Sequence, residues 1–209
     1  MALKEEIKGY LKKFWFLLWK DDSLKGWIFS VIFLFLFIKL IFFPVLNMAT
    51  GTSLPLAIVE SCSMYHQGDI LSNFVTWWTK HEDKYNIYDV DETSFKEFPF
   101  KKGFNKGDIL FITGTSPEKL QVGDIIIFNA GQQNPVIHRI INITKEKGTY
   151  IFSTIGDNNN GQLSSEKRIS SEQLVGKARF RIAPLLGWVK LEFYDWRNSQ
   201  SEKGFCQEN

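Results

Sequence analysis

The chain has 209 residues, of which 15 are Gly, 6 are Pro and 2 are Cys. This composition excludes a disulfide-stapled miniprotein and a collagen-like or low-complexity chain, and the length suits one ordinary domain with an appendage. Charge is nearly balanced, with 25 Lys and Arg against 23 Asp and Glu, and no concentrated basic patch indicates a nucleic-acid partner. The 19 Phe and 7 Trp contrast with a mean hydropathy of −0.14, so the apolar residues are unevenly distributed.

The first of these apolar regions lies near the start of the chain. Residues 27–46 form an apolar run that contains a single charge, Lys39, and a helix of this length spans the roughly 30 Å hydrocarbon core of a bilayer. A buried core helix would keep a polar stripe, and a cleavable signal peptide has a shorter apolar run of about 7–15 residues. We therefore predict a retained transmembrane helix over residues 27–46.

Basic residues near this run indicate its orientation. No Lys or Arg occurs from Val45 through Trp78, whereas six lysines precede the run: Lys4, Lys8, Lys12, Lys13, Lys20 and Lys25. The positive-inside rule then predicts a cytoplasmic N-terminus, with everything after about residue 47 on the other side. Residues 1–26 mix Lys with Phe, Trp and Leu, which favours a helix in the membrane interface over a simple helical extension of the span.

Short runs rich in Ile, Val and Phe follow the span. They occupy residues 54–60, 107–113, 122–128, 135–143, 149–155 and 174–182, and are bounded by Gly, Asp, Asn or Pro. No long amphipathic helix alternates with them, so residues 47–196 are predicted to be a mainly antiparallel β domain rather than a βαβ sheet. Residues 197–209 are predicted to be a flexible tail.

Clustered aromatic residues interrupt this pattern between about residues 70 and 104, which indicates an insertion with one or two short helices. The adjacent Trp77 and Trp78 suit either a small core of their own or a contact with lipid headgroups. His81 is expected on the surface of the insertion, and His66 is expected to line a cleft.

Three segments carry residue types that acyl-transfer hydrolysis requires: residues 61–69, 136–140 and 155–160. Such chemistry needs a nucleophile, a base that accepts its proton near neutral pH, and a group that orients the base. The Gly-Asp pairs that contain Asp69, Asp108 and Asp124 are explained as strand-opening turns. No cluster of His, Cys, Asp or Glu has metal-ligand spacing, so we expect no metal site and no cofactor.

The sequence motifs in these segments, and their order, resemble those of type I signal peptidases, which are membrane-bound serine proteases that remove signal peptides. The chain carries S-x-S-M at residues 61–64, H-R at 138–139, G-D-N-N at 156–159 and a closing G-K block within 174–191, all after a single N-terminal span. The resemblance covers residues 27 to about 193 apart from the insertion, and it implies a signal-peptidase-like antiparallel β domain. His before Arg resembles the archaeal and endoplasmic-reticulum branch, since bacterial enzymes carry Lys there; the insertion favours an archaeal enzyme.

The resemblance also implies roles for individual residues. Ser63 would be the nucleophile and His138 the general base, with the Ser61 hydroxyl and the Ser63 N–H facing the oxyanion. Asp157 matches the family's acid. His-type enzymes usually carry a further Asp about six residues later, where this chain has Leu163, so Glu166 is the alternative residue to orient His138. His66 stands where the family has Pro.

Cys62 lies beside the expected nucleophile, which makes a Cys–His protease a rival on paper. Alternation along an extended chain points Cys62 away from the side of Ser61 and Ser63. A small apolar filler is the prediction for Cys62, with pairing to Cys206 on the oxidising side of the membrane as the alternative.

The activity implied by the resemblance is cleavage of translocated preproteins after small residues at positions −1 and −3. The expected partners are preprotein signal peptides, the lipid bilayer and a protein translocase, and the expected location is the cell or endoplasmic-reticulum membrane. One alternative is a catalytically inactive, membrane-anchored β module that binds a translocase or another membrane protein, which the departures at His66 and Leu163 would favour. A Ser–Lys autoprotease of the related repressor fold is disfavoured by the span and by His138.

Overall fold

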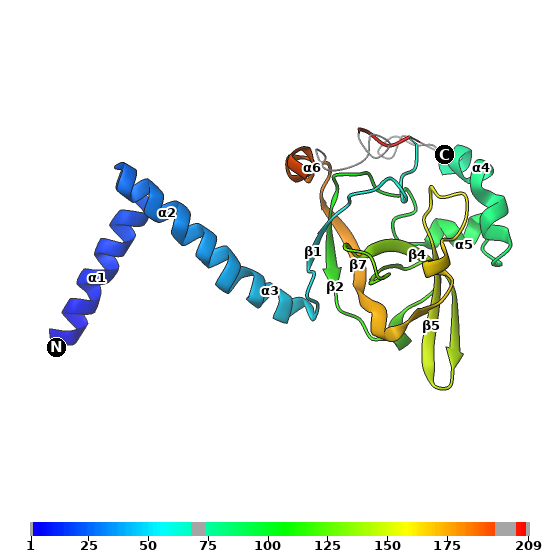
Figure 1. Cartoon of the computed structure of the whole chain (residues 1–209), viewed down its shortest axis with the longest axis horizontal. Helices are drawn as coiled ribbons and strands as arrows, with labels where there is room; N and C mark the ends of the chain where they lie inside the picture. Colours follow the sequence, from blue (N-terminus) through cyan, green and yellow to red (C-terminus); the bar gives the residue numbers. More distant parts are fainter. Residues whose placement is uncertain (1, 68–73, 195–203, 208–209) are drawn as a thin grey trace. The chain divides into compact units, whose positions relative to one another are not determined.

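The computed structural model describes residues 2–67, 74–194 and 204–207. It divides into two compact units, Met1–Ala49 and Thr50–Asn209. The first unit is helical, and the second is built around a β-sheet (Figure 1).

The helical unit contains two helices joined by a short break. Helix α1 (Ala2–Trp19) is followed by α2 (Leu24–Phe37), which begins where the Ser23 side chain accepts a hydrogen bond from the Gly26 backbone N at 3.2 Å. The Ser30 hydroxyl donates to the carbonyl oxygen of Leu18 at 3.0 Å, so α2 packs against α1. The segment before the apolar run is therefore a separate helix in the structure rather than an extension of the span.

The apolar helix continues beyond α2 through a π-helical turn (Ile38–Phe42) and α3 (Phe43–Thr50). Together they form one helix, Leu24–Thr50, that is long and apolar enough to cross a membrane, and it includes the predicted residues 27–46. Most of its large apolar side chains are exposed within this unit, as expected for a helix whose apolar surface faces lipid.

The second unit is a curled antiparallel sheet of seven strands in the order β1-β2-β7-β3-β4-β5-β6 (Figure 1). The strands are β1 (Leu56–Ile58), β2 (Ile109–Thr113), β3 (Ile125–Phe128), β4 (Val136–Glu146), β5 (Thr149–Ile155), β6 (Ile169–Ser170) and β7 (Leu174–Ala183). Six of them lie at the predicted runs, so the prediction of a mainly antiparallel β fold is confirmed. Strand β6 is not apparent in the sequence, because it has only two residues and no hydrophobic alternation.

The core lies on both faces of this sheet, and β3 shows why. Ile125 and Ile127 belong to one buried cluster, whereas Ile126 and Phe128 belong to another. Successive side chains on a strand point to opposite faces, so a strand that is buried at every position must be covered on both sides. The sheet achieves this by curling.

The aromatic insertion contributes α4 (Phe74–Asn86) and α5 (Glu92–Glu97). Trp77 and Trp78 are only 2% and 3% exposed and pack with Phe95 and with Ile141 and Ile155 of the sheet. Because the rings are enclosed by protein, they are core residues, and the alternative of a headgroup contact is wrong.

His81 is a further correction within α4. We expected it on the surface, but it is 8% exposed, and its ring stacks on that of Trp77 with 4.6 Å between centroids. The two residues are one helical turn apart, so they share the face of α4 that packs against the core.

The remaining elements are short. They are 3₁₀ turns at Pro117–Lys119, Ser164–Glu166 and Ser171–Gln173, and α6 (Trp188–Tyr194). Asp108 accepts a hydrogen bond from the backbone N of Asn105 at 2.8 Å, and Asp124 accepts one from Gln121 at 3.0 Å, as their turn roles predict. Asp69 lies outside the described residues.

Candidate active site

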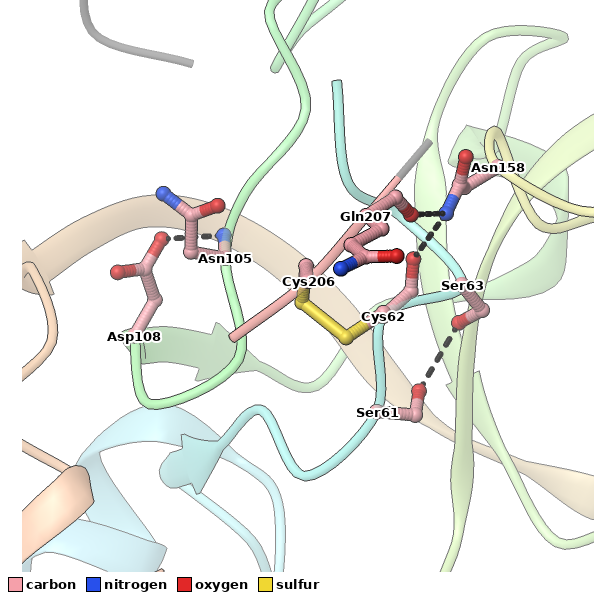
Figure 2. The surroundings of a disulfide bond; sticks show 8 residues. All are labelled: Ser61, Cys62, Ser63, Asn105, Asp108, Asn158, Cys206 and Gln207. Atoms are coloured by element: carbon pink, nitrogen blue, oxygen red, sulfur yellow. Dashed lines mark hydrogen bonds between the residues drawn. A yellow bond between two sulfur atoms is a disulfide. The ribbon is translucent and has the colours of Figure 1, made fainter. Parts of the chain in front are cut away.

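Ser61 and Ser63 lie on an irregular segment after β1, here called the serine loop (residues 61–67). Their hydroxyl oxygens are 3.1 Å apart, so one hydroxyl donates to the other (Figure 2). Ser61 is exposed and Ser63 is half-buried. The pair is therefore accessible, whereas Met64 and His66 of the same loop are buried.

The serine loop is tied to the turn that follows β5. The Ser63 carbonyl accepts a hydrogen bond from the backbone N of Asn158 at 2.7 Å. A Cβ on Gly156 would lie 2.8 Å from that same carbonyl oxygen, which is closer than real Cβ contacts allow. Glycine is thus required at position 156 because the backbone of the serine loop approaches it so closely.

His138 lies on β4, and its partner is Glu166 rather than Asp157, the residue that matches the family's acid. Its Nδ1 hydrogen-bonds to the Oε1 of Glu166, and both side chains are buried. The second oxygen of Glu166 accepts the backbone N–H of Leu163 at 2.7 Å, which holds the carboxylate in place. An ionised Glu166 only accepts, so Nδ1 of a neutral His138 carries the proton and Nε2 carries the lone pair.

Asp157 has other partners. Its carboxylate receives hydrogen bonds from Arg139 at 2.6 and 2.9 Å and from the Tyr85 hydroxyl at 2.8 Å, and its Oδ2 lies 2.9 Å from His66 Nε2. All four side chains are buried, and among the described residues no interaction joins Asp157 to His138. The alternative, Glu166, is the carboxylate against His138.

The charges in this cluster hold its protons in place. Burial alone would raise the pKa of Asp157, but the Arg139 guanidinium and the His66 hydrogen bond outweigh burial and hold it well below its usual range. Burial lowers the pKa of His66 by more than Asp157 raises it, and burial together with Asp157 raises the pKa of Tyr85 well above its ordinary value. An ionised Asp157 between a charged Arg139 and a neutral His66 has a stable protonation state near pH 7, which suits support rather than proton transfer.

His66 makes more contacts than its sequence context predicts. We expected it to line a cleft, but it is 1% exposed, and its ring stacks on Trp77 of the insertion with 3.6 Å between centroids. Its hydrogen bond to Asp157 attaches the far end of the serine loop to the core. The signal that could have found it is the replacement of the family's Pro by a side chain with two hydrogen-bonding atoms.

The strand register brings the serine loop and His138 toward the same end of the sheet. Arg139 pairs with Ile155 across β4 and β5, so one further step of the antiparallel register sets His138 opposite Gly156. Gly156 is the residue against which the Ser63 carbonyl packs. In the described part of the chain no hydrogen bond joins Ser63 to His138, and the Nε2 of His138 has no hydrogen-bond partner there.

Cys62 points to the other side of the serine loop and forms a disulfide with Cys206 (Figure 2). The prediction that Cys62 is a small apolar filler is wrong, and the alternative pairing is what the structure contains. A sulfur held in a disulfide is no nucleophile, which removes the Cys–His protease. Among the described residues no group of three or more His, Cys, Asp or Glu side chains could hold a metal ion.

These features define an antiparallel β protein with an N-terminal apolar helix, a serine pair and a buried His–Glu pair. No family model matches the chain. It is 30% identical over 100 residues to the signal peptidase complex catalytic subunit SEC11C of Homo sapiens, covering 44% of this chain and 52% of that protein. It is 34% identical over 100 residues to the signal peptidase complex catalytic subunit sec11 of Dictyostelium discoideum, covering 44% and 55%.

A bacterial relative matches a shorter region. The chain is 40% identical over 57 residues to signal peptidase I W of Bacillus subtilis (strain 168), covering 27% of this chain and 30% of that protein. The chain spans about half the length of the SEC11 proteins it matches. The resemblance to type I signal peptidases is confirmed by these relatives, at modest identity over less than half of the chain.

Proposed function

We propose that this protein is a membrane-bound serine endopeptidase that removes signal peptides from translocated preproteins after small residues at positions −1 and −3. The observation that carries the proposal is the buried His138–Glu166 pair, whose strand register sets His138 opposite Gly156, the residue that the Ser63 carbonyl approaches, in a homologue of signal peptidases. The −1 and −3 preference rests on the family resemblance. His rather than Lys at position 138 supports the Ser–His branch, to which the resemblance assigns archaeal and endoplasmic-reticulum enzymes.

In the proposed reaction Ser63 is the nucleophile. Its Oγ attacks the scissile carbonyl carbon while Nε2 of His138 takes the hydroxyl proton, and Glu166 stabilises the imidazolium through Nδ1–H. The tetrahedral intermediate collapses, the scissile C–N bond breaks, and Nε2 gives its proton to the leaving amine. A water molecule, deprotonated by the same nitrogen, then hydrolyses the acyl-enzyme and releases Ser63.

Ser61 would stabilise the negative charge that develops on the carbonyl oxygen. Its hydroxyl lies 3.1 Å from Ser63 Oγ. In the tetrahedral intermediate the former carbonyl carbon is bonded to Ser63 Oγ, so the Ser61 hydroxyl is within reach of the oxyanion on that carbon. Together with the Ser63 N–H it would form an oxyanion site, in which one donor contributes about 2.7–4 kcal/mol to transition-state stabilisation.

Asp157 would support the site without orienting the base. Its backbone N–H donates to the Sδ of Met64 at 3.4 Å, and its carboxylate bonds His66. Both contacts reach the serine loop, so Asp157 would help to fix the position of Ser63 in that loop. We assign Asp157 to the site as a positioning residue and Glu166 as the residue that orients His138.

The two departures from the family pattern support an enzyme over an inactive binding module. At Leu163 the missing acid has a local replacement, because Glu166 three residues later bonds both the Leu163 N–H and His138. At His66 the missing Pro is replaced by a side chain that is anchored to Asp157. Neither departure leaves the required chemistry without a residue.

The proposed partners are preprotein signal peptides, the bilayer and a translocase. The matched relatives are named as catalytic subunits of a signal peptidase complex, which supports a complex here as well. We propose a single-pass protein of the cell or endoplasmic-reticulum membrane, with a cytoplasmic N-terminus and its β domain outside the cytoplasm. The Cys62–Cys206 disulfide supports this orientation, because disulfides persist in oxidising compartments.

Cleavage of a preprotein by the full chain in detergent tests the proposal. Ser63→Ala and His138→Ala are each expected to lower kcat by at least about 10³-fold, since either change removes the activated nucleophile. Ser116→Ala is the matched control, because Ser116 lies in a turn outside the site. Cleavage that persists in Ser63→Ala would contradict the mechanism. A wild-type protein that binds preproteins without cleaving them would favour the inactive binding module.

A further inference from the structure

The Cys62–Cys206 disulfide attaches residues 204–207 to the serine loop, and no step of the proposed reaction uses it. Asn158 reinforces the attachment: its side-chain amide donates to the Cys62 carbonyl at 3.1 Å and to the Gln207 carbonyl at 2.9 Å (Figure 2). The backbone N of Asn158 also bonds the Ser63 carbonyl at 2.7 Å. The serine loop, the turn after β5 and residues 204–207 therefore meet at one side chain.

The disulfide is the strongest of the attachments described for residues 204–207. The Phe205 ring lies 5.3 Å from that of Trp188, yet Phe205 remains 80% exposed and so buries little area. The Gln207 contact is a single hydrogen bond between partly buried groups. Two weak contacts of this kind would not hold the segment in one position without the covalent bond.

The disulfide adds a side-chain restraint to the backbone contacts that hold the serine loop. Before the loop, Val59 exchanges backbone hydrogen bonds with Gly107 and Asp108 at 2.8 and 2.9 Å. After Ser63, the Met64 carbonyl accepts from the Phe104 N at 3.0 Å. Between these anchors, the side chains of Ser61 and Ser63 meet on one side while that of Cys62 turns to the other (Figure 2). A bond at Cys62 thus holds the rotation of this short segment, and with it the direction of both hydroxyls.

We propose that the Cys62–Cys206 disulfide positions the two serine hydroxyls, so that full proteolytic activity requires oxidation of these cysteines. Cys206 is then a positioning residue that acts through Cys62. Formation of the S–S bond removes two protons and two electrons from the thiols, which a thiol–disulfide oxidant outside the cytoplasm accepts. A dithiol such as dithiothreitol reverses the step by becoming a cyclic disulfide. The consequence is a protease that becomes fully active after its β domain has crossed the membrane. The inference rests on the proposed function.

Kinetics of the full chain in detergent, with a synthetic peptide that carries Ala at −1 and −3, test this inference. Cys206→Ser leaves the sequence of the serine loop unchanged, and we expect kcat to fall by roughly 10- to 100-fold with KM within about twofold, since a small displacement of a nucleophile has this effect. Dithiothreitol should lower wild-type kcat equally and leave Cys206→Ser unaffected. Phe205→Ala, which keeps the disulfide, is the matched control and should retain wild-type kcat. If the disulfide only stabilised the fold, its loss in Cys206→Ser would lower the melting temperature and leave kcat unchanged at temperatures well below it.

Two further measurements keep the inference separate from the proposed function. Mass spectrometry after thiol alkylation should find no free Cys in the oxidised protein; two free thiols would overturn the inference. Hydrogen exchange of peptides covering residues 61–67, measured in Ser63→Ala with and without dithiothreitol, should become faster on reduction; unchanged exchange would also overturn it, as would wild-type kcat in Cys206→Ser. If oxidised wild type cleaves nothing, the proposed function fails, and the exchange experiment still decides whether the disulfide holds the loop.

Discussion

At the residue scale, the site depends on which of two buried carboxylates hydrogen-bonds to His138. Glu166 bonds His138, whereas Asp157 is occupied by Arg139, His66 and Tyr85. The two carboxylates therefore predict two different kinds of damage when they are removed, one to the rate of reaction and one to the stability of the fold.

Glu166→Gln should damage catalysis more than folding. The amide keeps an oxygen that can accept the Leu163 N–H, but rotation to offer NH₂ to His138 would favour the tautomer with the proton on Nε2. We expect kcat to fall by about 10²- to 10⁴-fold with little change in KM or melting temperature. Steady-state kinetics with the alanine-containing peptide measure this effect. An unchanged kcat would remove Glu166 from the reaction.

Asp157→Ala should damage folding first. It leaves the Arg139 guanidinium buried without its carboxylate, and breaking a buried ion pair in this way costs about 3–5 kcal/mol. Denaturant unfolding of the full chain in detergent measures the loss. Glu146→Ala, which breaks an exposed ion pair with Arg168, is the control and should change stability far less. Equal losses in the two variants would contradict the support role of Asp157.

His66 makes stability depend on pH in a defined window. Its pKa is lowered in the folded protein, whereas the unfolded chain has the ordinary value of about 6.5, so below that pH the unfolded state binds the extra proton first. Stability should therefore fall as pH drops below about 6.5, until the lower folded pKa is passed. The carboxylate of Asp157 remains ionised in both states until pH approaches about 4. Melting temperatures at pH 5 and pH 8 should differ less in His66→Gln than in wild type; an equal difference would show that other groups dominate.

At the element scale, the insertion forms a second layer over the sheet and contacts Arg139, which pairs with Asp157. Helices α4 and α5 pack Trp77, Trp78, Tyr85 and Phe95 against β4 and β5. The Phe95 ring also lies 4.7 Å from the guanidinium carbon of Arg139, so the insertion covers the ion pair that supports the serine loop.

Phe95→Ala should test this connection. Phe95 is fully buried, and truncation of a buried Phe costs about 3–5 kcal/mol through lost transfer energy and the cavity that remains. We expect the free energy of unfolding to fall by that amount. Phe180→Ala is the matched control, since Phe180 is 53% exposed on β7 and its truncation should cost much less. A loss at Phe95 no larger than at Phe180 would mean that the insertion packs loosely.

At the scale of the whole molecule, one covalent bond joins residues that are far apart in the chain, and one apolar helix precedes the β domain. The disulfide joins residues that are 144 positions apart, and closing a loop of that length lowers the entropy of the unfolded chain by an amount equivalent to about 5 kcal/mol in the chain-entropy model. The helix Leu24–Thr50 separates the basic N-terminal residues from the β domain along the chain.

The proposed orientation makes a prediction about labelling. In sealed cells or vesicles, a Cys introduced as Lys4→Cys should be protected from a membrane-impermeant maleimide, whereas Lys145→Cys should react from outside the cytoplasm. Both positions are exposed. Labelling after detergent lysis gives the total for each variant. The reverse pattern would invert the topology and contradict the assignment of Ser63 to the outer side.

Local patterns in the sequence were sufficient for the apolar helix and for six of the seven strands, and they supplied Ser63 and His138 as candidate site residues whose roles stay predictions. Each of these follows from the composition of a few consecutive residues or from the short motifs around Ser63 and His138, and each motif lies within one segment of the chain. Only the tertiary structure decided that Glu166 serves His138, that His66 bonds Asp157, that Cys62 pairs with Cys206 and that Trp77 is buried. The first three contacts join residues 28, 91 and 144 positions apart. Their partners depend on strand register and on how the insertion packs, and neither is encoded in the periodicity of one segment.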